Sequence, residues 1–366
     1  MEDPSEVFFP TKFHKQSVIF FNAYDFEKVT VCPDKKMKGL KSRTQRVCRF
    51  CGLKYGEVFF KKDAHIISEL LGNQYLVSDF ECDDCNQSFS IYESHLSHFI
   101  GGTRAFQKLY GTQKNYKFKS PDKKILAENF NLYGLENSFS VSREDVEDQT
   151  FEYNRQTGET LINFIKHSYS PLLVYKSILK IALSCLPEIY LENYSLAFKY
   201  IQTNLLDDKI KGAANVFIYS TPPGIGYNTP FVALYKKKDE KRKICTHVFV
   251  MYFLNQIYQI VLPLNSNDLN FYSSELMEVI YCPPIFGDKE TSNTVPIYQR
   301  HLDMSSMELV KGEKETVGFK DVSESVNEKV FDPKTNDLKD DGFNFDAITK
   351  LVFMPNDSHI ILPEKN

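Results

Sequence analysis

The chain has 366 residues, of which 42% are hydrophobic and 25% charged, a length that usually gives two and sometimes three domains. It contains no run of about eighteen consecutive apolar residues that would span a membrane. Its N-terminus, MEDPSE, lacks the basic-then-apolar layout of a signal peptide. We therefore expect a cytoplasmic protein that does not enter the membrane.

The formal net charge of −4 conceals a difference between two parts of the chain. Residues 1–124 carry twenty Lys and Arg against fifteen Asp and Glu, a net charge of +5, whereas residues 125–366 carry twenty-four against thirty-three, a net charge of −9. A basic first part suits a polyanionic partner such as nucleic acid. A lysine-rich solvated surface explains the same excess, so the charge alone leaves both interpretations open.

The N-terminal segment predicts one or two strands followed by a basic arm. Apolar and polar residues alternate in Ser17–Asn22 and in Lys28–Cys32, the pattern of a strand with one buried face. Residues 33–46, PDKKMKGLKSRTQR, hold six Lys and Arg and one Asp. We interpret this segment as a basic loop or arm that leads into the next motif.

Two CxxC knuckles frame the most informative segment of the chain. Cys48 and Cys51 form the first, Cys82 and Cys85 form the second, and thirty residues separate the two. Four thiolates at this spacing can close a tetrahedral zinc site with no open position, so this Zn²⁺ would organise the chain rather than take part in chemistry. In a reducing compartment, we expect the scattered cysteines to be buried thiols: Cys32, Cys185, Cys245 and Cys282.

The residues between and after the knuckles predict a strand, a loop and a helix. Residues 56–61 have the composition of a strand, and residues 64–81 form a loop with Gly72-Asn73 as a turn signal. Residues 86–100 predict a helix, because apolar residues recur at spacings of three and four: Phe89, Tyr92, Leu96 and Phe99. A strand, a loop and a helix tied at both ends by zinc make a ββα-like unit.

Residues 101–124 interleave basic and aromatic side chains. The basic residues include Arg104, Lys108, Lys114 and Lys117. Basic groups can neutralise phosphates while aromatic rings stack on unpaired bases, although a basic surface with half-buried rings gives the same pattern. Residues 125–158 are polar and acidic, and we expect them to connect two domains.

Residues 159–366 predict a mixed helical and antiparallel-sheet domain. Ser170 is an N-cap with Pro171 at the first helical position, the apolar run Leu172–Leu186 continues this helix, and a second helix is expected over 189–205. Four strands follow in an antiparallel meander: Asn215–Ser220, Phe231–Tyr235, Cys245–Phe253 and Gln256–Leu262. Residues 284–345 predict a long loop region with short elements. The whole chain is thus expected to be α+β.

The knuckle region holds the residues that hydrolysis of a phosphodiester requires. His65 lies between the knuckles, and an imidazole can deprotonate a water near neutral pH. Asn86, directly after the second knuckle, offers a neutral oxygen ligand for a hard divalent cation, Mg²⁺ or Mn²⁺. Glu93 lies on the same face of the expected helix and Asp63 two residues before His65, so either carboxylate could complete the site.

These residues resemble the HNH endonuclease family, of the ββα-metal type. The branch of that family reading CxxCG, AHIIPExLGN and ECDxCNxxFxxxE is matched in order by CRFCG (48–52), AHIISELLGN (64–73) and ECDDCNQSFSIYE (81–93). The resemblance covers about a fifth of the chain. It implies metal-dependent cleavage of nucleic acid, with the His65 position as general base and the Asn86 position as a metal ligand.

The chain departs from the family pattern at four places, one of which is Ser68, where this branch usually has proline. Asn86 stands where many members have histidine, and Ala64 stands where many have an Asp or His metal ligand. Val77 and Ser78 occupy the stretch in which the family usually places its middle asparagine. The ligands of a catalytic metal are therefore less well defined by the resemblance than the zinc-stapled fold.

The sequence predicts three regions: an HNH nuclease domain at 1–124 with its core at 48–100, a connector at 125–158, and an α+β domain at 159–366. The first domain is expected to bind nucleic acid, DNA in preference to RNA, through basic residues: Lys61, Lys62, Arg104, Lys108, Lys114 and Lys117. The last would sense a signal ligand, choose a substrate or bind a regulatory protein, as in nucleases of antiviral defence against phage. The sequence is compatible with an oligomer of this chain.

Two interpretations compete with the nuclease. A zinc-stapled module could bind nucleic acid without cleaving it, which Ala64 and the missing middle asparagine favour. Alternatively, the zinc fold could serve only in assembly or protein interaction. Cleavage that depends on His65 separates the nuclease from the other two interpretations. Binding of nucleic acid without cleavage separates the binding module from the assembly module.

Overall fold

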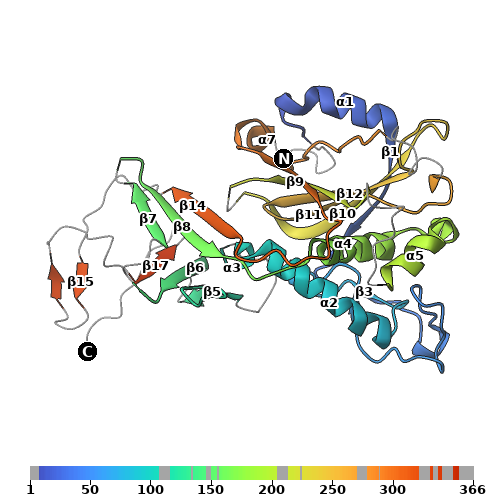
Figure 1. Ribbon diagram of the computed structural model, residues 1–366, viewed down its shortest axis with the longest axis horizontal. Helices are drawn as coiled ribbons and strands as arrows, with labels where there is room; N and C mark the ends of the chain where they lie inside the picture. Colours follow the sequence, from blue (N-terminus) through green and yellow to red (C-terminus); the bar gives the residue numbers. More distant parts are fainter. Residues whose placement is uncertain are drawn as a thin grey trace. The chain divides into compact units, whose positions relative to one another are not determined.

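The structure is a computed structural model of the chain (Figure 1). It describes residues 8–106, 116–132, 135–145, 150–154, 156–203, 213–222, 225–269, 278–287, 289–320, 330–332, 337–339 and 349–353. The chain divides into two compact units built from separated segments. The first comprises Met1–Phe99, Leu109–Thr112 and Tyr169–Val310, and the second comprises Ile100–Lys108, Gln113–Ser168 and Lys311–Asn366.

The predicted α+β class with antiparallel sheets is confirmed, but the two units differ from the predicted ranges 1–124, 125–158 and 159–366. The difference arises because strands far apart in the sequence pair with each other. In the first unit an N-terminal strand pairs with one beyond residue 226, and in the second unit a strand near residue 160 pairs with one beyond residue 313.

The first unit is built around a six-stranded antiparallel sheet with the order β1-β10-β11-β12-β9-β13. Its strands are β1 (Tyr24–Val31), β9 (Asn215–Ser220), β10 (Tyr227–Lys237), β11 (His247–Leu254), β12 (Gln256–Val261) and β13 (Tyr298–Asp303). Every residue of β11 and β12 is buried, as expected of central strands that are covered on both faces. Figure 1 places α1 (His14–Ala23) on one side of this sheet and α4 (Pro171–Cys185) and α5 (Ser195–Ile201) on the other.

The strand order departs from the predicted meander. β10, β11 and β12 do follow one another, but β9 pairs with β12 and β13 rather than with β10. The strand predicted at Ser17–Asn22 is wrong, because these residues lie in α1. Ser17, Phe20 and Ala23 are the buried residues of this helix, and the Phe20 ring packs 5.0 Å from that of Tyr235 on β10.

The predicted start of α4 is confirmed, with Ser170 as N-cap and Pro171 at the first position. All of its residues are buried, as expected of a helix enclosed on every side. Lys176 and Lys180 are therefore two lysines in a core helix. The predicted helix over 189–205 is shorter in the structure, where the 3₁₀ turns η4 (Glu188–Tyr190) and η5 (Glu192–Tyr194) precede α5.

The cysteine region of the first unit has little regular structure. It contains η2 (Arg43–Gln45), β2 (Ala64–His65), η3 (Glu69–Leu71), β3 (Val77–Ser78) and α2 (Asp83–Ile100). β2 and β3 form a two-stranded antiparallel sheet, and α2 follows it. The strand predicted over residues 56–61 is not formed, and α2 begins three residues earlier than predicted, directly after Cys82.

The second unit contains two small antiparallel sheets and a hairpin. One sheet has the order β17-β6-β5-β4 and the other β14-β8-β7, and β15 pairs with β16. The elements are α3 (Thr103–Phe106), β4 (Lys117–Lys119), β5 (Ile125–Leu132), β6 (Leu135–Arg143), β7 (Phe151–Asn154), β8 (Glu159–Ile165), β14 (Lys314–Lys320), β15 (Val330–Asp332), β16 (Asp337–Lys339) and β17 (Lys350–Phe353). Residues 125–158 are thus not a connector, because Ile125, Ala127 and Val141 are fully buried in the core of this unit.

The remaining described elements are η1 (Thr11–Phe13) and α7 (Lys289–Thr294), both in the first unit. α7 and strands β13 to β16 lie within residues 284–345, so this region has more regular structure than predicted. Among the described residues, no helix has the length and apolar character needed to cross a membrane.

Candidate metal and catalytic site

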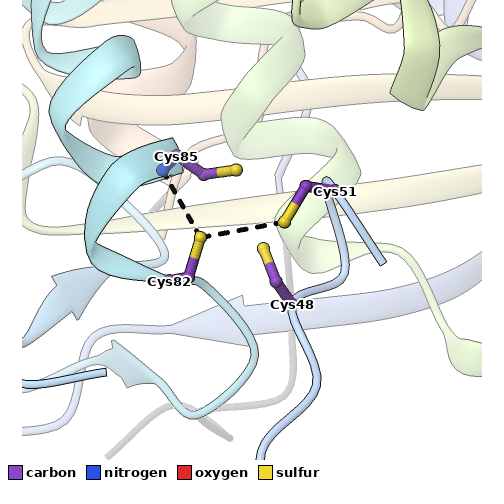
Figure 2. A group of neighbouring side chains, drawn as sticks. All are labelled: Cys48, Cys51, Cys82 and Cys85. Atoms are coloured by element: carbon purple, nitrogen blue, oxygen red, sulfur yellow. Dashed lines mark hydrogen bonds between the residues drawn. The ribbon is translucent and has the colours of Figure 1, made fainter. Parts of the chain in front are cut away.

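The four knuckle cysteines converge on one point of the first unit. The Sγ atoms of Cys48, Cys51, Cys82 and Cys85 all lie within 4.8 Å of one another, and Cys51 Sγ is 3.8 Å from Cys82 Sγ (Figure 2). Gly52 turns the first knuckle with a φ of 76°, which glycine adopts without strain. The second knuckle enters α2. The predicted grouping is confirmed, and these four side chains could hold a metal ion such as zinc.

The pKa values of these four thiols are shifted in different directions by their surroundings. A hydrogen bond from Cys85 lowers the pKa of Cys48 to about 5, whereas burial raises the pKa of Cys82 to about 12. The Cys85 thiol, which donates to Cys48, has a raised pKa. Sulfur atoms this close have to share protons or bind a cation. Thiolates are the ligands that zinc prefers in closed structural sites, so the donor set fits that ion.

The loop between β2 and β3 is organised by Asn73, which is fully buried. Its Nδ2 donates to Ile67 O at 2.5 Å and to Leu76 O at 2.9 Å, and its Oδ1 accepts from Leu76 N at 2.8 Å. These two carbonyls match both amide hydrogens. The 3.3 Å approach of Nδ2 to His65 Nδ1 is therefore a packing contact that fixes the position of the ring.

His65 is half-buried on β2, where it pairs with Val77. Burial lowers the pKa of His65, which favours the neutral imidazole that can accept a proton. Three carboxylates act in the opposite direction, Glu69 most strongly, then Glu93 and Asp63. His65 therefore lies within electrostatic reach of both predicted carboxylates and of a third, Glu69, that the sequence did not single out.

A buried ion pair contacts the backbone of His65. The Nζ atom of Lys180 on α4 is 3.0 Å from Glu81 Oε2 and donates to the backbone carbonyl of His65 at 2.8 Å. Lys180 and Glu81 are each 2% exposed. Burial raises the pKa of Glu81, and Lys180 opposes that shift. The ammonium thus joins helix α4 to the histidine and to the residue before the second knuckle.

The predicted ligands of a catalytic metal are only partly brought together. Asn86 and Glu93 are both half-buried on α2, whereas Asp63 is exposed. Ala64 is buried and supplies no ligand atom. Within the part of the chain that the structure describes, the knuckle cysteines are the only group of three or more His, Cys, Asp or Glu side chains arranged to hold a metal.

Two predicted phosphate contacts lie close to His65 in the sequence and are exposed. The backbone N–H groups of Lys61 and Lys62 donate to the Asp83 carboxylate at 3.1 and 2.9 Å, which anchors their backbone to the first residue of α2. The Lys61 ammonium lies 4.4 Å from the centre of the exposed Phe59 ring. From the basic arm, Arg43 donates to Lys61 O at 3.2 Å. These basic side chains therefore share one surface.

The other predicted basic residues belong to different surroundings. Arg104 stacks 4.2 Å from the centre of the Tyr116 ring, and Lys117 forms an ion pair with Glu128 at 2.5 Å. Both residues are in the second unit. Lys108 and Lys114 lie outside the described residues. A continuous basic track from Lys61 to Lys117 is therefore not established by these contacts.

Sequence reasoning missed the buried polar residues that hold His65. Asn73 belongs to a turn signal and is the last residue of the AHIISELLGN block, but neither pattern predicts that its side chain holds the loop. A lysine inside the apolar run of α4 was the single signal for Lys180. Nothing in the sequence indicated that Glu81 is its partner, since the two residues lie in separate segments of the chain.

Comparison of the chain with protein-family models, with curated proteins and with solved structures gives no match in any of the three. The resemblance to HNH endonucleases consequently depends on the three short sequence blocks.

Proposed function

We propose that this protein is a metal-dependent endonuclease of the HNH type that hydrolyses phosphodiester bonds of nucleic acid. The observation that carries the proposal is the setting of His65. Its ring is half-buried against Asn73, its carbonyl is bound by Lys180, and three carboxylates lie within electrostatic reach. A neutral imidazole in such a setting is suited to take a proton from an attacking water.

The parts of the site have separate tasks in this proposal. The four cysteines hold a structural Zn²⁺ that ties the first knuckle to the start of α2. A Mg²⁺ or Mn²⁺ ion, held by Asn86 with Glu93 or Asp63, would neutralise charge on the scissile phosphate. Glu69 could contribute a further carboxylate, directly or through water. Lys61 and Lys62 would bind the flanking phosphates.

We infer that the substrate is DNA rather than RNA, because the three matching blocks are those of a family of DNA endonucleases. The segment 169–310 would regulate the nuclease or recognise a ligand or partner, as an antiviral defence effector in the cytoplasm requires. The support for regulation is that α4, from this segment, contacts the backbone of His65 directly.

A nucleic-acid-binding module without catalysis is the second candidate. The observation that favours it is the buried Ala64, which leaves the residue beside His65 without a ligand atom. The exposed Lys61, Lys62 and Phe59 would serve such a module equally well. A pure assembly module is the third interpretation, and it requires no binding of nucleic acid.

One experiment separates these candidates. The purified full chain is incubated with plasmid and single-stranded substrates in Mg²⁺ or Mn²⁺, and compared with His65→Ala and with the control His14→Ala, an exposed histidine on α1. The nuclease predicts cleavage by the wild type and by His14→Ala, but not by His65→Ala. Binding without cleavage would support the second candidate, and the absence of binding would support the third.

A further inference from the structure

Helix α4 is fastened to the cysteine region at both of its ends. At the N-terminus, the backbone N–H of Ser170 donates to His95 Nδ1 on α2 at 2.9 Å. At the C-terminus, the Arg49 guanidinium, from inside the first knuckle, donates to the carbonyls of Leu183, Ser184 and Leu186 at 3.3, 2.9 and 3.1 Å. A cation placed on the last carbonyls of a helix is favourable. The helix therefore has a defined position against the site.

Lys180 occupies the middle of this contact. An ammonium has three N–H donors and no acceptor, and Lys180 directs this group at Glu81 Oε2 and His65 O, at 3.0 and 2.8 Å. Glu81 directly precedes Cys82, a member of the metal cluster. One buried charge thus links the backbone of the proposed general base to the chain that enters the metal site.

The two-stranded sheet that contains His65 is too short to hold this residue in position by itself. β2 and β3 pair through only two residue pairs, Ala64 with Ser78 and His65 with Val77. Asn73 restrains the loop through the carbonyls of Ile67 and Leu76. Lys180 supplies a second restraint, because it binds the carbonyl of His65 itself.

We propose that Lys180 is a positioning residue for the nuclease reaction, which holds His65 in its catalytic position by binding its backbone carbonyl, with Glu81 as the counter-ion that fixes the ammonium. The inference rests on the proposed function, since it assigns Lys180 to the reaction of His65. It goes beyond that function because the residue comes from the segment 169–310. The catalytic region then depends on a helix outside residues 48–100, and a movement of α4 would reach His65 directly.

The test needs a variant that removes the ammonium and still folds. Breaking a buried ion pair by removing one partner leaves an unpaired charge, whereas replacing both partners with apolar residues of similar volume is often neutral for stability. The double variant Lys180→Met with Glu81→Met meets this requirement. The matched control is Lys176→Met, which changes a buried lysine one turn earlier on α4. The Lys176 ammonium donates to Tyr200 O at 3.4 Å, whereas Lys180 donates to His65 O.

Two readouts are measured on the zinc-loaded full chain. Amide hydrogen exchange of residues 64–78 reports the position of the loop without any need for activity. Steady-state cleavage reports kcat and KM separately. We expect the double variant to raise exchange in 64–78 about tenfold or more and to lower kcat by about 100-fold with little change in KM, because a small misplacement of a catalytic group has an effect of that size. Exchange in β11 and β12 should not change.

The proposal is overturned if the double variant retains zinc but leaves both exchange in 64–78 and kcat at wild-type values, or if Lys176→Met changes them equally. If the double variant does not fold, Lys180→Arg decides: it keeps a charged donor and should retain most of kcat, whereas a loss equal to that of His65→Ala contradicts the proposal. A wild-type protein that cleaves no substrate refutes the nuclease function, and hydrogen exchange then still decides whether Lys180 holds the His65 loop.

Discussion

Two regions of the first unit are stabilised in opposite ways. The six-stranded sheet has long strands, and its central strands β11 and β12 pair in continuous register and are buried along their whole lengths. The region around His65 has strands of two residues and is held by Asn73, by the pair of Lys180 and Glu81, and by four converging cysteines. The sheet thus depends on apolar burial, which is spread over many residues, whereas the His65 region depends on a few polar groups and on four cysteines that could hold a metal.

This difference teaches that the two regions should fail separately. Removing one residue from a large apolar core lowers stability, but the rest of the core still packs. Removing one member of a small polar network leaves its buried partners unpaired. Single substitutions in the His65 region should therefore disrupt it locally while the sheet persists.

The largest effect is expected from loss of the metal. Cys48→Ser combined with Cys82→Ser should abolish zinc binding and lower cleavage by at least about 100-fold, because a metal held by cysteines of both knuckles would couple the folding of this region to metal binding. Metal analysis and hydrogen exchange measure the result. Residues 48–100 should lose protection while β11 and β12 keep theirs, and Cys282→Ala should retain the metal. Equal loss of protection in both regions would contradict the separation.

Asn73→Ala should have the next largest effect. The substitution removes the Asn73 partner of the Ile67 carbonyl and of the Leu76 N–H, whereas Leu76 O keeps its bond from Ile66 N, which corresponds to about 2 kcal/mol. We expect faster exchange in residues 64–78 and a kcat lowered by about tenfold or more. The exposed Asn22→Ala on α1 is the control. Wild-type exchange in Asn73→Ala would show that this residue does not organise the loop.

A pH-dependent prediction addresses the sheet. Burial lowers the pKa of His247 on β11 to about 3, and its Nδ1 lies 2.8 Å from the hydroxyl of Tyr194. The unfolded chain therefore binds more protons than the folded chain between about pH 6.5 and 3, so the free energy of unfolding falls as the pH falls, by about 1.4 kcal/mol per unit.

His247→Gln removes the titration and keeps an amide that can accept from Tyr194. The free energy of unfolding of the wild type should fall by about 2 kcal/mol more than that of the variant between pH 6.5 and 5. Denaturant titrations followed by a signal from the sheet measure this difference. Parallel curves for the two proteins would show that His247 is not kept neutral by burial.

The smallest effect is expected at the contact between the first knuckle and the C-terminal end of α4. Arg49→Lys keeps the charge but loses the planar donor group that reaches three carbonyls and stacks 3.8 Å from the centre of the Phe80 ring. We expect a loss of about 1 kcal/mol, or about 2–4 °C in Tm, with zinc content unchanged. A loss of zinc would mean that the cap of α4 and the metal site cannot be separated.

The sequence predicted those features that are encoded over short distances. The CxxC spacing located the cysteine cluster, and apolar periodicity located α4 and most strands of the sheet. Pairings between distant segments were not predictable: β1 pairs with β10, and Lys180 binds His65 across 115 residues. No local pattern specifies which buried charge meets which carbonyl. The strand predicted over residues 17–22 is a helix in the structure, because so short a pattern fits a strand and a helix equally well.

The rate of cleavage by wild-type protein and His65→Ala tests the central claim most directly. Both proteins, zinc-loaded and in the full chain, are mixed in excess with labelled DNA at fixed Mg²⁺, and the first turnover is timed. Loss of the general base should slow the wild-type reaction by about 100- to 10,000-fold, with zinc content and folding unchanged. Equal rates in the two proteins, or no cleavage by the wild type, would contradict the assignment of His65 as the base of a nuclease.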